Sequence, residues 1–139
     1  MKHPPSPRPT DAELDILAVL WDQGPSTVRE VHERLHRPRG AGYTTTLKLM
    51  QIMAGKELVE RDESQRAHVY RPALSKSRTA GKMTGELLDR LFGGSAERLM
   101  MHLLGSRKVS RKEIARIRKM LDEVEDRTDT ARETTDEHE

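Results

Sequence analysis

Three short segments with helical spacing follow one another in the first part of the chain, and each begins at a helix-capping signal. TDAE (Thr10–Glu13) and TVRE (Thr27–Glu30) are potential capping boxes, in which threonine and glutamate side chains satisfy first-turn amides. Thr44 is expected to cap the third segment. Gly24-Pro25 and Pro38 should end the first two. The sequence therefore predicts three consecutive short helices.

The hydrophobic period changes after the third segment. LVERD (58–62) and RAHVYR (66–71) are short runs rich in Val and Tyr, and the polar ESQ separates them, which is typical of a β-hairpin. Helix, helix, helix and hairpin is the order of a winged helix-turn-helix, whose third helix can lie in the major groove of DNA. We expect a mainly α fold with a small β-hairpin, followed by a C-terminal helical dimerisation region.

Helical spacing returns beyond Pro72, over residues 76–92, after Ser95, and after the capping box SRKE (Ser110–Glu113). In the last helix, apolar residues are spaced as in a heptad seam, which favours pairing with another helix. Only 34% of the chain is hydrophobic and 3% aromatic, so one copy buries little apolar surface on itself. The candidate dimer interface comprises Met83, Leu87, Leu91, Leu99, Leu103, Ile114, Ile117, Leu121 and Val124.

These patterns divide the chain into four parts. A proline-rich flexible arm over 1–9 precedes a winged-helix domain over 10–74. A helical dimerisation domain over 75–126 precedes an acidic disordered tail over 127–139.

Charge is unevenly distributed. Residues 75–121 carry 12 basic and 4 acidic side chains, whereas residues 122–139 carry 2 basic and 9 acidic ones. A polyanionic partner fits the basic region. The alternative is that this charge only solvates helix faces.

Several classes of function are disfavoured. Without cysteine, the chain has no disulfide, thiolate metal site or cysteine nucleophile. No apolar run approaches a membrane span and no signal peptide is recognisable, so we expect a cytoplasmic protein. His32 and His36 lack a third ligand, and no nucleophile lies beside a base. We expect no metal, no cofactor and no enzymatic activity.

The start of the third helix carries the binding hypothesis. If Leu47, Met50 and Met53 face the core, then Thr44, Thr45, Lys48 and Gln51 point outward, where they can contact phosphates and base edges. The alternative is that Thr45 and Thr46 are merely first-turn residues. The candidate DNA-binding residues are Arg39, Tyr43, Thr44, Thr45, Thr46, Lys48, Gln51, Lys56 and Arg66.

The runs PTDAELDILAVLWDQGPSTVREVHERL, YTTTLKLMQIM and RAHVYRPALS together resemble the BlaI/MecI family of penicillinase repressors, which includes the copper-responsive CopY type. The resemblance implies a dimeric winged-helix repressor of antibiotic-resistance or stress genes that binds palindromic operators through DNA-reading helices. It also implies dimerisation through the C-terminal helices. The cysteines of the CopY type are missing, which excludes a copper-thiolate sensor.

In some members of that family, a membrane sensor protease cuts between Asn and Phe in the short fifth helix. The matching pair in this chain is His102 and Leu103. The chain also carries Thr46 where relatives often have Val, Ile52 where they often have a basic residue, and Glu57 where they usually have Gly.

Two other functions use the same fold. A protein-interaction adaptor could dock through the winged helix, and an architectural DNA binder could rely on charge alone. A preference for one inverted repeat over random DNA separates a repressor from both.

Overall fold

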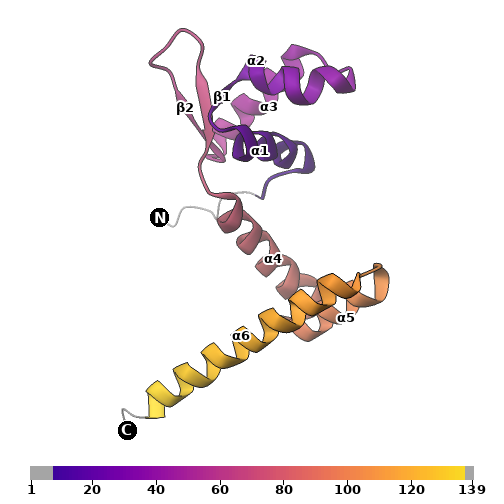
Figure 1. The fold of residues 1–139 in the computed structure, drawn as a ribbon. Helices are drawn as coiled ribbons and strands as arrows, with labels where there is room; N and C mark the ends of the chain where they lie inside the picture. Colours follow the sequence, from indigo (N-terminus) through magenta and orange to yellow (C-terminus); the bar gives the residue numbers. More distant parts are fainter. Residues whose placement is uncertain (1–7, 137–139) are drawn as a thin grey trace. The chain divides into compact units, whose positions relative to one another are not determined.

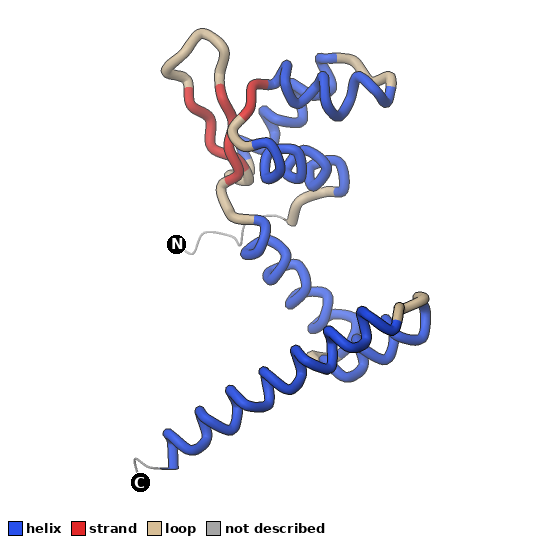
Figure 2. Tube along the Cα trace, viewed as in Figure 1, coloured by secondary structure: helices blue, strands red, loops and turns tan. Residues whose placement is uncertain are grey.

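The computed structural model describes residues 8–136, with side chains to Arg132, and divides into two compact units, one ending at Leu87 and the other beginning at Leu88. Within the described residues the fold is mainly helical with one small antiparallel sheet (Figures 1 and 2). The elements, in order, are α1 (Asp11–Gln23), β1 (Ser26–Thr27), α2 (Val28–Val31), η1 (His32–His36), η2 (Arg37–Arg39), α3 (Tyr43–Gly55), β2 (Val59–Asp62), β3 (Val69–Pro72), α4 (Lys76–Phe92), α5 (Ala96–Ser106) and α6 (Arg111–Asp136).

The helix starts of the first unit follow the predicted capping boxes. The Thr10 hydroxyl accepts a hydrogen bond from the Glu13 amide, and the Glu13 carboxylate accepts one from the Thr10 amide. Thr27 and Glu30 make the same reciprocal pair at the start of α2. These bonds satisfy amides that have no partner within the helix.

The core of the first unit lies between α1, the α2–η1 segment, α3 and the sheet. It is formed by Ile16, Leu17, Val19, Leu20, Val28, Val31, Leu35, Met50, Met53, Val59 and Tyr70. The prediction that Met50 and Met53 face inward is confirmed, and Leu47 is partly buried against them. On α1 the buried face includes Ile16 and Leu20, while Ala18 is exposed.

The sheet has three strands in the order β1-β3-β2 rather than the expected two. β2 and β3 form the predicted wing, in which Arg61 lies opposite Tyr70. Ser26 and Thr27 add the third strand by pairing with Tyr70 and Val69. A strand of two residues is too short to show the alternation of apolar and polar side chains that predicts a strand. The extended backbone that Thr27 needs as an N-cap also permits strand pairing.

The second helical segment does not end at Pro38 as expected. After α2 the backbone widens into the π-turn η1, and Pro38 then sits inside the 3₁₀-turn η2. Proline is tolerated in a first helical turn, because its missing N–H has no acceptor to lose there. Gly40, with φ 77°, ends the segment instead.

α3 ends in a Schellman motif. The Leu58 amide donates to the Met53 carbonyl at 2.9 Å and the Glu57 amide donates to the Ala54 carbonyl at 3.1 Å. Glu57 has φ 63°, in the left-handed region where glycine is usual. A side chain with a Cβ therefore occupies a strained position at this helix end.

The first unit extends beyond the expected boundary at residue 74. The Trp21 indole N–H donates to the Leu74 carbonyl at 3.0 Å, and Thr79 on α4 is buried. Arg8, the first described residue, pairs with Glu86 at 2.9 Å. The first part of α4 therefore belongs with the winged helix, while residues 1–7 of the predicted arm lie outside the described residues.

In the second unit, Ser95 caps α5 as expected, and the Ser110 hydroxyl accepts from the Glu113 amide at 3.1 Å at the start of α6. The prediction of disorder from residue 127 is wrong for the described residues, since α6 continues to Asp136. The Thr128 hydroxyl bonds back to the Val124 carbonyl, a contact that threonine makes within a continuing helix. Residues 137–139 of the predicted tail lie outside the described residues.

Candidate nucleic-acid interface

The first turn of α3 presents polar side chains outward. Thr44, Thr45, Lys48 and Gln51 are all exposed, as the spacing predicted. The N-cap is Gly42 and not Thr44, and no side chain caps this helix. The Thr44 hydroxyl is therefore free of the capping role that we expected for it.

Thr46 does not belong to this outward face. It is fully buried, and its hydroxyl oxygen lies 2.6 Å from His36 Nδ1 and 3.2 Å from His32 Nδ1. A helix turns by about 100° per residue, which carries Thr46 to the inner side of α3 while Thr45 stays outside. Thr46 is thus removed from the candidate DNA contacts.

A groove of about 440 Å³ runs between the start of α2, the outer side of α3 and the wing. Its lining residues are Thr27, Val28, Arg29, Tyr43, Leu47, Gln51, Arg61, Arg66, Ala67, His68 and Tyr70. Three arginines and no acidic side chain line it, so the groove suits a polyanion. Gln51, Tyr43 and Arg66 of the predicted set meet here.

Arg29 was missed by the sequence reasoning. Its guanidinium carbon lies 5.6 Å from the centre of the Tyr43 ring, within the range of a cation–π contact. The other partner of Tyr43 is the His32 ring, at 5.7 Å in an edge-to-face arrangement. In the sequence Arg29 is marked only by its place directly after a helix start. Its role becomes recognisable when the packing of α2 against α3 brings it to Tyr43.

The wing supplies the other two arginines that line the groove. Arg61 pairs with Glu63 at 2.5 Å. The Tyr70 side chain and Glu63 raise the pKa of Arg61 above its ordinary value, so the guanidinium stays charged. Arg66 is exposed, which leaves it available to a phosphate.

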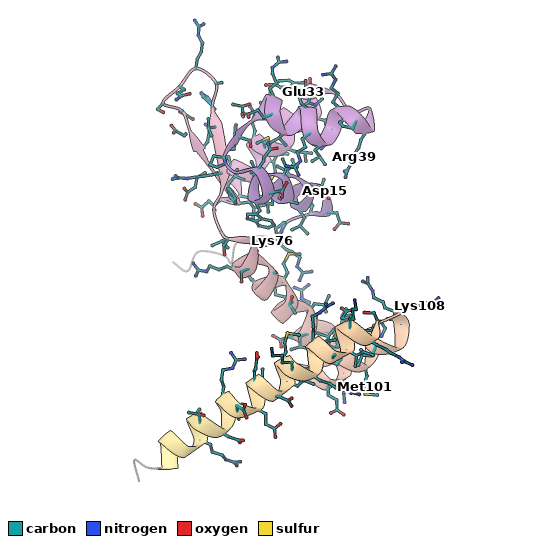
Figure 3. The ribbon with its side chains drawn as sticks, viewed as in Figure 1. Asp15, Glu33, Arg39, Lys76, Met101 and Lys108 are labelled. Carbon is teal, nitrogen blue, oxygen red and sulfur yellow. The ribbon has the colours of Figure 1, made fainter. Side chains whose placement is uncertain are left out.

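Two predicted phosphate contacts have partners within the protein. Arg39 pairs with Asp15 of α1 at 3.0 Å, and both side chains are about half exposed (Figure 3). Lys56 Nζ lies 3.0 Å from both carboxylate oxygens of Glu13. Because Glu13 is 1% exposed, Lys56 neutralises a buried charge, and we assign it to this ion pair rather than to DNA.

Glu13 remains ionised despite its burial. Desolvation raises its pKa, but hydrogen bonds from the Thr10 amide, the Lys56 ammonium and the Thr10 hydroxyl outweigh it and hold the pKa below its ordinary value. The pair joins the start of α1 to the end of α3 and so helps to fix the orientation of α3.

The second unit contains an apolar groove of about 470 Å³ between α5 and α6. Leu103, Ile117, Leu121 and Val124 of the predicted dimer interface line it. Leu99 and Ile114, which are close in sequence to residues that line the groove, are partly buried. Leu91 is 71% exposed.

The other two predicted interface residues, Met83 and Leu87, fall within the first unit. Met83 lines a separate cavity of about 130 Å³ together with Leu17 and Leu58.

The suggested cleavage pair lies in α5. Leu103 is 39% exposed, and the His102 ring lies 5.8 Å from the Phe92 ring. The His102 carbonyl accepts a hydrogen bond from the Ser106 hydroxyl at 2.7 Å. The backbone at this pair is helical.

His32 and His36 do not form part of a metal cluster. Among the described residues, no group of three or more His, Asp or Glu side chains is arranged to hold an ion. No helix in the described part of the chain has both the length and the apolar character needed to cross a bilayer.

Three helices, a wing and a basic groove between them define a winged helix-turn-helix. The family model for the penicillinase repressor matches residues 9–123. The chain belongs to this penicillinase repressor family.

Individual relatives agree with the family match. The transcriptional regulator BlaI of Mycobacterium tuberculosis strain H37Rv is 33% identical over 117 residues, which cover 83% of each protein. The penicillinase repressor of Staphylococcus aureus is 20% identical over 113 residues, covering 81% of this chain and 90% of the relative. The penicillinase repressor of Bacillus licheniformis is 22% identical over 121 residues, covering 87% of this chain and 94% of the relative.

The predicted family and fold class are therefore confirmed, and the protein is a transcriptional repressor. Its relatives are repressors and not enzymes.

Proposed function

We propose that this repressor binds an inverted-repeat operator as a homodimer, with α3 of each subunit in one of two successive major grooves. The observation that carries the proposal is the basic groove beside the exposed face of α3, lined by Arg29, Arg61 and Arg66. In the proposed complex its arginines follow a phosphate backbone while the helix faces the base edges.

The side chains divide into two groups. Thr44, Arg29, Arg39 and Arg66 anchor the protein through phosphates, with Arg39 exchanging Asp15 for DNA.

Thr45, Lys48 and Gln51 select sequence. Lys can donate to guanine, Gln can pair with adenine, and Thr can donate to a base or contact the thymine methyl. Tyr43 supports the first group, because its ring lies against Arg29.

The pattern of burial supports dimerisation through α5 and α6. From Leu88 to Arg132 no side chain is buried, yet Leu121 and Val124 are apolar and line the groove of the second unit. A second copy would cover this surface. Two linked recognition helices then bind an inverted repeat far more tightly than one.

We also propose the mode of release that the family resemblance suggests. A cut between His102 and Leu103 would separate α6 from the DNA-binding unit and so break the link between the two recognition helices. Control of antibiotic-resistance or stress genes and the action of a membrane sensor protease belong to the same proposal.

The test is selection of duplexes from a random library with the full chain, followed by gel-shift titration against random competitor. A repressor retains the selected inverted repeat when random DNA is in excess. A lack of preference would indicate an architectural DNA binder, and binding to neither DNA would indicate an adaptor.

A further inference from the structure

A buried hydroxyl links the recognition helix to the helical segment that supports it. Thr46 is 0% exposed, and its Oγ1 lies between the Nδ1 atoms of His36 and His32, at 2.6 Å and 3.2 Å. His36 is itself 7% exposed. Both histidines belong to η1, the wide π-turn that continues α2.

We call the contact of Thr46 with His32 and His36 the junction. Its hydrogen bonds depend on which of the three side chains supplies each hydrogen. A threonine hydroxyl has one hydrogen, so it can donate to one imidazole Nδ1 while it accepts from the Nδ1–H of the other. A ring that accepts the hydroxyl hydrogen carries its own hydrogen on Nε2, whereas a ring that donates to the hydroxyl oxygen carries it on Nδ1. A proton added to a ring that accepts the hydroxyl hydrogen makes both of its nitrogens donors, and the hydroxyl hydrogen then loses that acceptor.

The charges around His36 oppose such a proton. Burial lowers the pKa of His36, and the neighbouring His32 and Arg39 lower it further, while Asp15 on α1 acts in the opposite direction. Burial and these charges together favour the neutral ring, the only form in which Nδ1 of His36 can accept the Thr46 hydroxyl hydrogen.

Thr46 occupies the inner side of the same turn that presents Thr45 and Lys48 outward. A shift of α3 that breaks the Thr46 bonds also moves the outward side chains, because the helix backbone is rigid over one turn. Base readout requires placement within a fraction of an ångström, whereas phosphate attraction does not.

We propose that Thr46 and His36 are positioning residues, which hold α3 in the orientation that discriminates an operator from random DNA. The inference rests on the proposed function and deepens it. Neither residue contacts DNA; both act through the face formed by Thr45, Lys48 and Gln51.

The test compares Thr46→Val, which removes the hydroxyl at nearly constant volume, with Thr46→Ser, which keeps it. Thr79→Val is the matched control, because Thr79 is also buried in the first unit but lies on α4. Each full-length variant is titrated with the duplex that the wild-type chain selects and with random duplex, and its thermal unfolding is followed by circular dichroism.

We expect Thr46→Val to bind the selected duplex about tenfold more weakly, since a buried partner loses its hydrogen bond, with random-duplex affinity within about twofold. Thr46→Ser and Thr79→Val should discriminate as the wild type does. A Thr46→Val variant that melts at lower temperature but keeps wild-type discrimination while folded would overturn the positioning role.

The wild-type chain supplies a second measurement that does not depend on the folding of a variant. Because the pKa of His36 is lowered from 6.5, the ratio of selected to random affinity should hold near neutral pH and fall only below about pH 6.5, as His36 takes up a proton. A ratio that stays constant down to the pH at which the chain unfolds overturns the proposal. A wild-type chain that selects no duplex overturns the proposed function, whereas equal discrimination by wild type and Thr46→Val overturns only the positioning role.

Discussion

The two units of this repressor differ in how they bury apolar surface. The first contains side chains such as Ile16, Val31 and Met50 that are 0% exposed. In the second, from Leu88 to Arg132, no side chain is buried, and Met101 and Leu121 are 67% and 59% exposed. The first unit therefore buries an apolar core of its own, whereas the second unit leaves its apolar side chains partly exposed to solvent.

The magnitudes favour a partner for the second unit. Complete burial of one Leu, Val or Met side chain contributes about 1.5 to 3 kcal/mol. Because Met120, Leu121 and Val124 are 54%, 59% and 48% exposed, covering them gains about half of that figure for each side chain. A second copy that covers the exposed face of α6 would therefore stabilise the dimer that we propose.

The largest expected effect comes from a charge placed in the apolar groove. Leu121→Asp should convert the proposed dimer to monomers, because a carboxylate buried without a partner is strongly unfavourable. Loss of the second recognition helix should weaken operator binding by about a hundredfold or more. Sedimentation velocity and gel-shift titration measure the two effects.

The control for that variant is Ala115→Asp, which puts the same charge on α6 at a residue that does not line the groove. It should remain dimeric. A dimeric Leu121→Asp would remove the groove from the interface.

The next effect concerns the core of the first unit. Lys56→Ala should lower the free energy of unfolding by about 3 kcal/mol, because it leaves the buried Glu13 carboxylate without its ammonium partner. Urea denaturation measures this loss. Lys48→Ala, at an exposed lysine, is the control and should leave stability within about 0.5 kcal/mol. Equal stability of the two variants would contradict the structural role of Lys56.

The same ion pair predicts an acid dependence. The folded-state pKa of Glu13 lies below the ordinary glutamate value of 4.5, so its contribution to stability is complete above that value and is lost as pH falls through the folded-state pKa. Urea midpoints across this acidic range should fall less steeply for Glu13→Gln than for the wild type. Parallel slopes would show that other carboxylates dominate.

A smaller effect tests the outward face of α3. Lys48→Ala should weaken binding of the selected operator by about fivefold to tenfold and reduce the slope of log affinity against log salt by up to about one. The dimer should be unaffected. Lys76→Ala, on α4, is the matched control for charge. Unchanged operator affinity would remove Lys48 from the interface.

The smallest expected effect is a gain. Glu57→Gly should stabilise the first unit by about 0.5 to 1 kcal/mol, because glycine adopts a positive φ without the Cβ strain. Glu57→Ala keeps the Cβ and should give no comparable gain. Thermal unfolding of the three proteins distinguishes strain relief from loss of the glutamate charge.

Local signals predicted the elements of the first unit well. The Thr10–Glu13 and Thr27–Glu30 boxes act over three residues, so the sequence alone contains both partners of each bond. Helical spacing likewise identified Met50 and Met53 as core residues. Strand β1 was missed because Ser26 and Thr27 pair with residues more than 40 positions away.

The candidate site was predicted less completely, because its residues are assigned by packing between elements. Thr45 and Thr46 are chemically identical, yet one is exposed and the other bonds to His36. Lys56 looked like a phosphate ligand until Glu13, 43 residues earlier, proved to be its partner. Arg29 gains a role only when Tyr43 lies beside it.

The central claim is that two copies of α3 read one inverted repeat. Its most direct test is the stoichiometry and affinity of the full chain on the selected duplex and on a duplex with one half-site scrambled, by native mass spectrometry and gel shift. We predict two chains per intact duplex and a loss of about a hundredfold or more on the half-site. One chain per duplex with equal affinity for both DNAs would contradict the account.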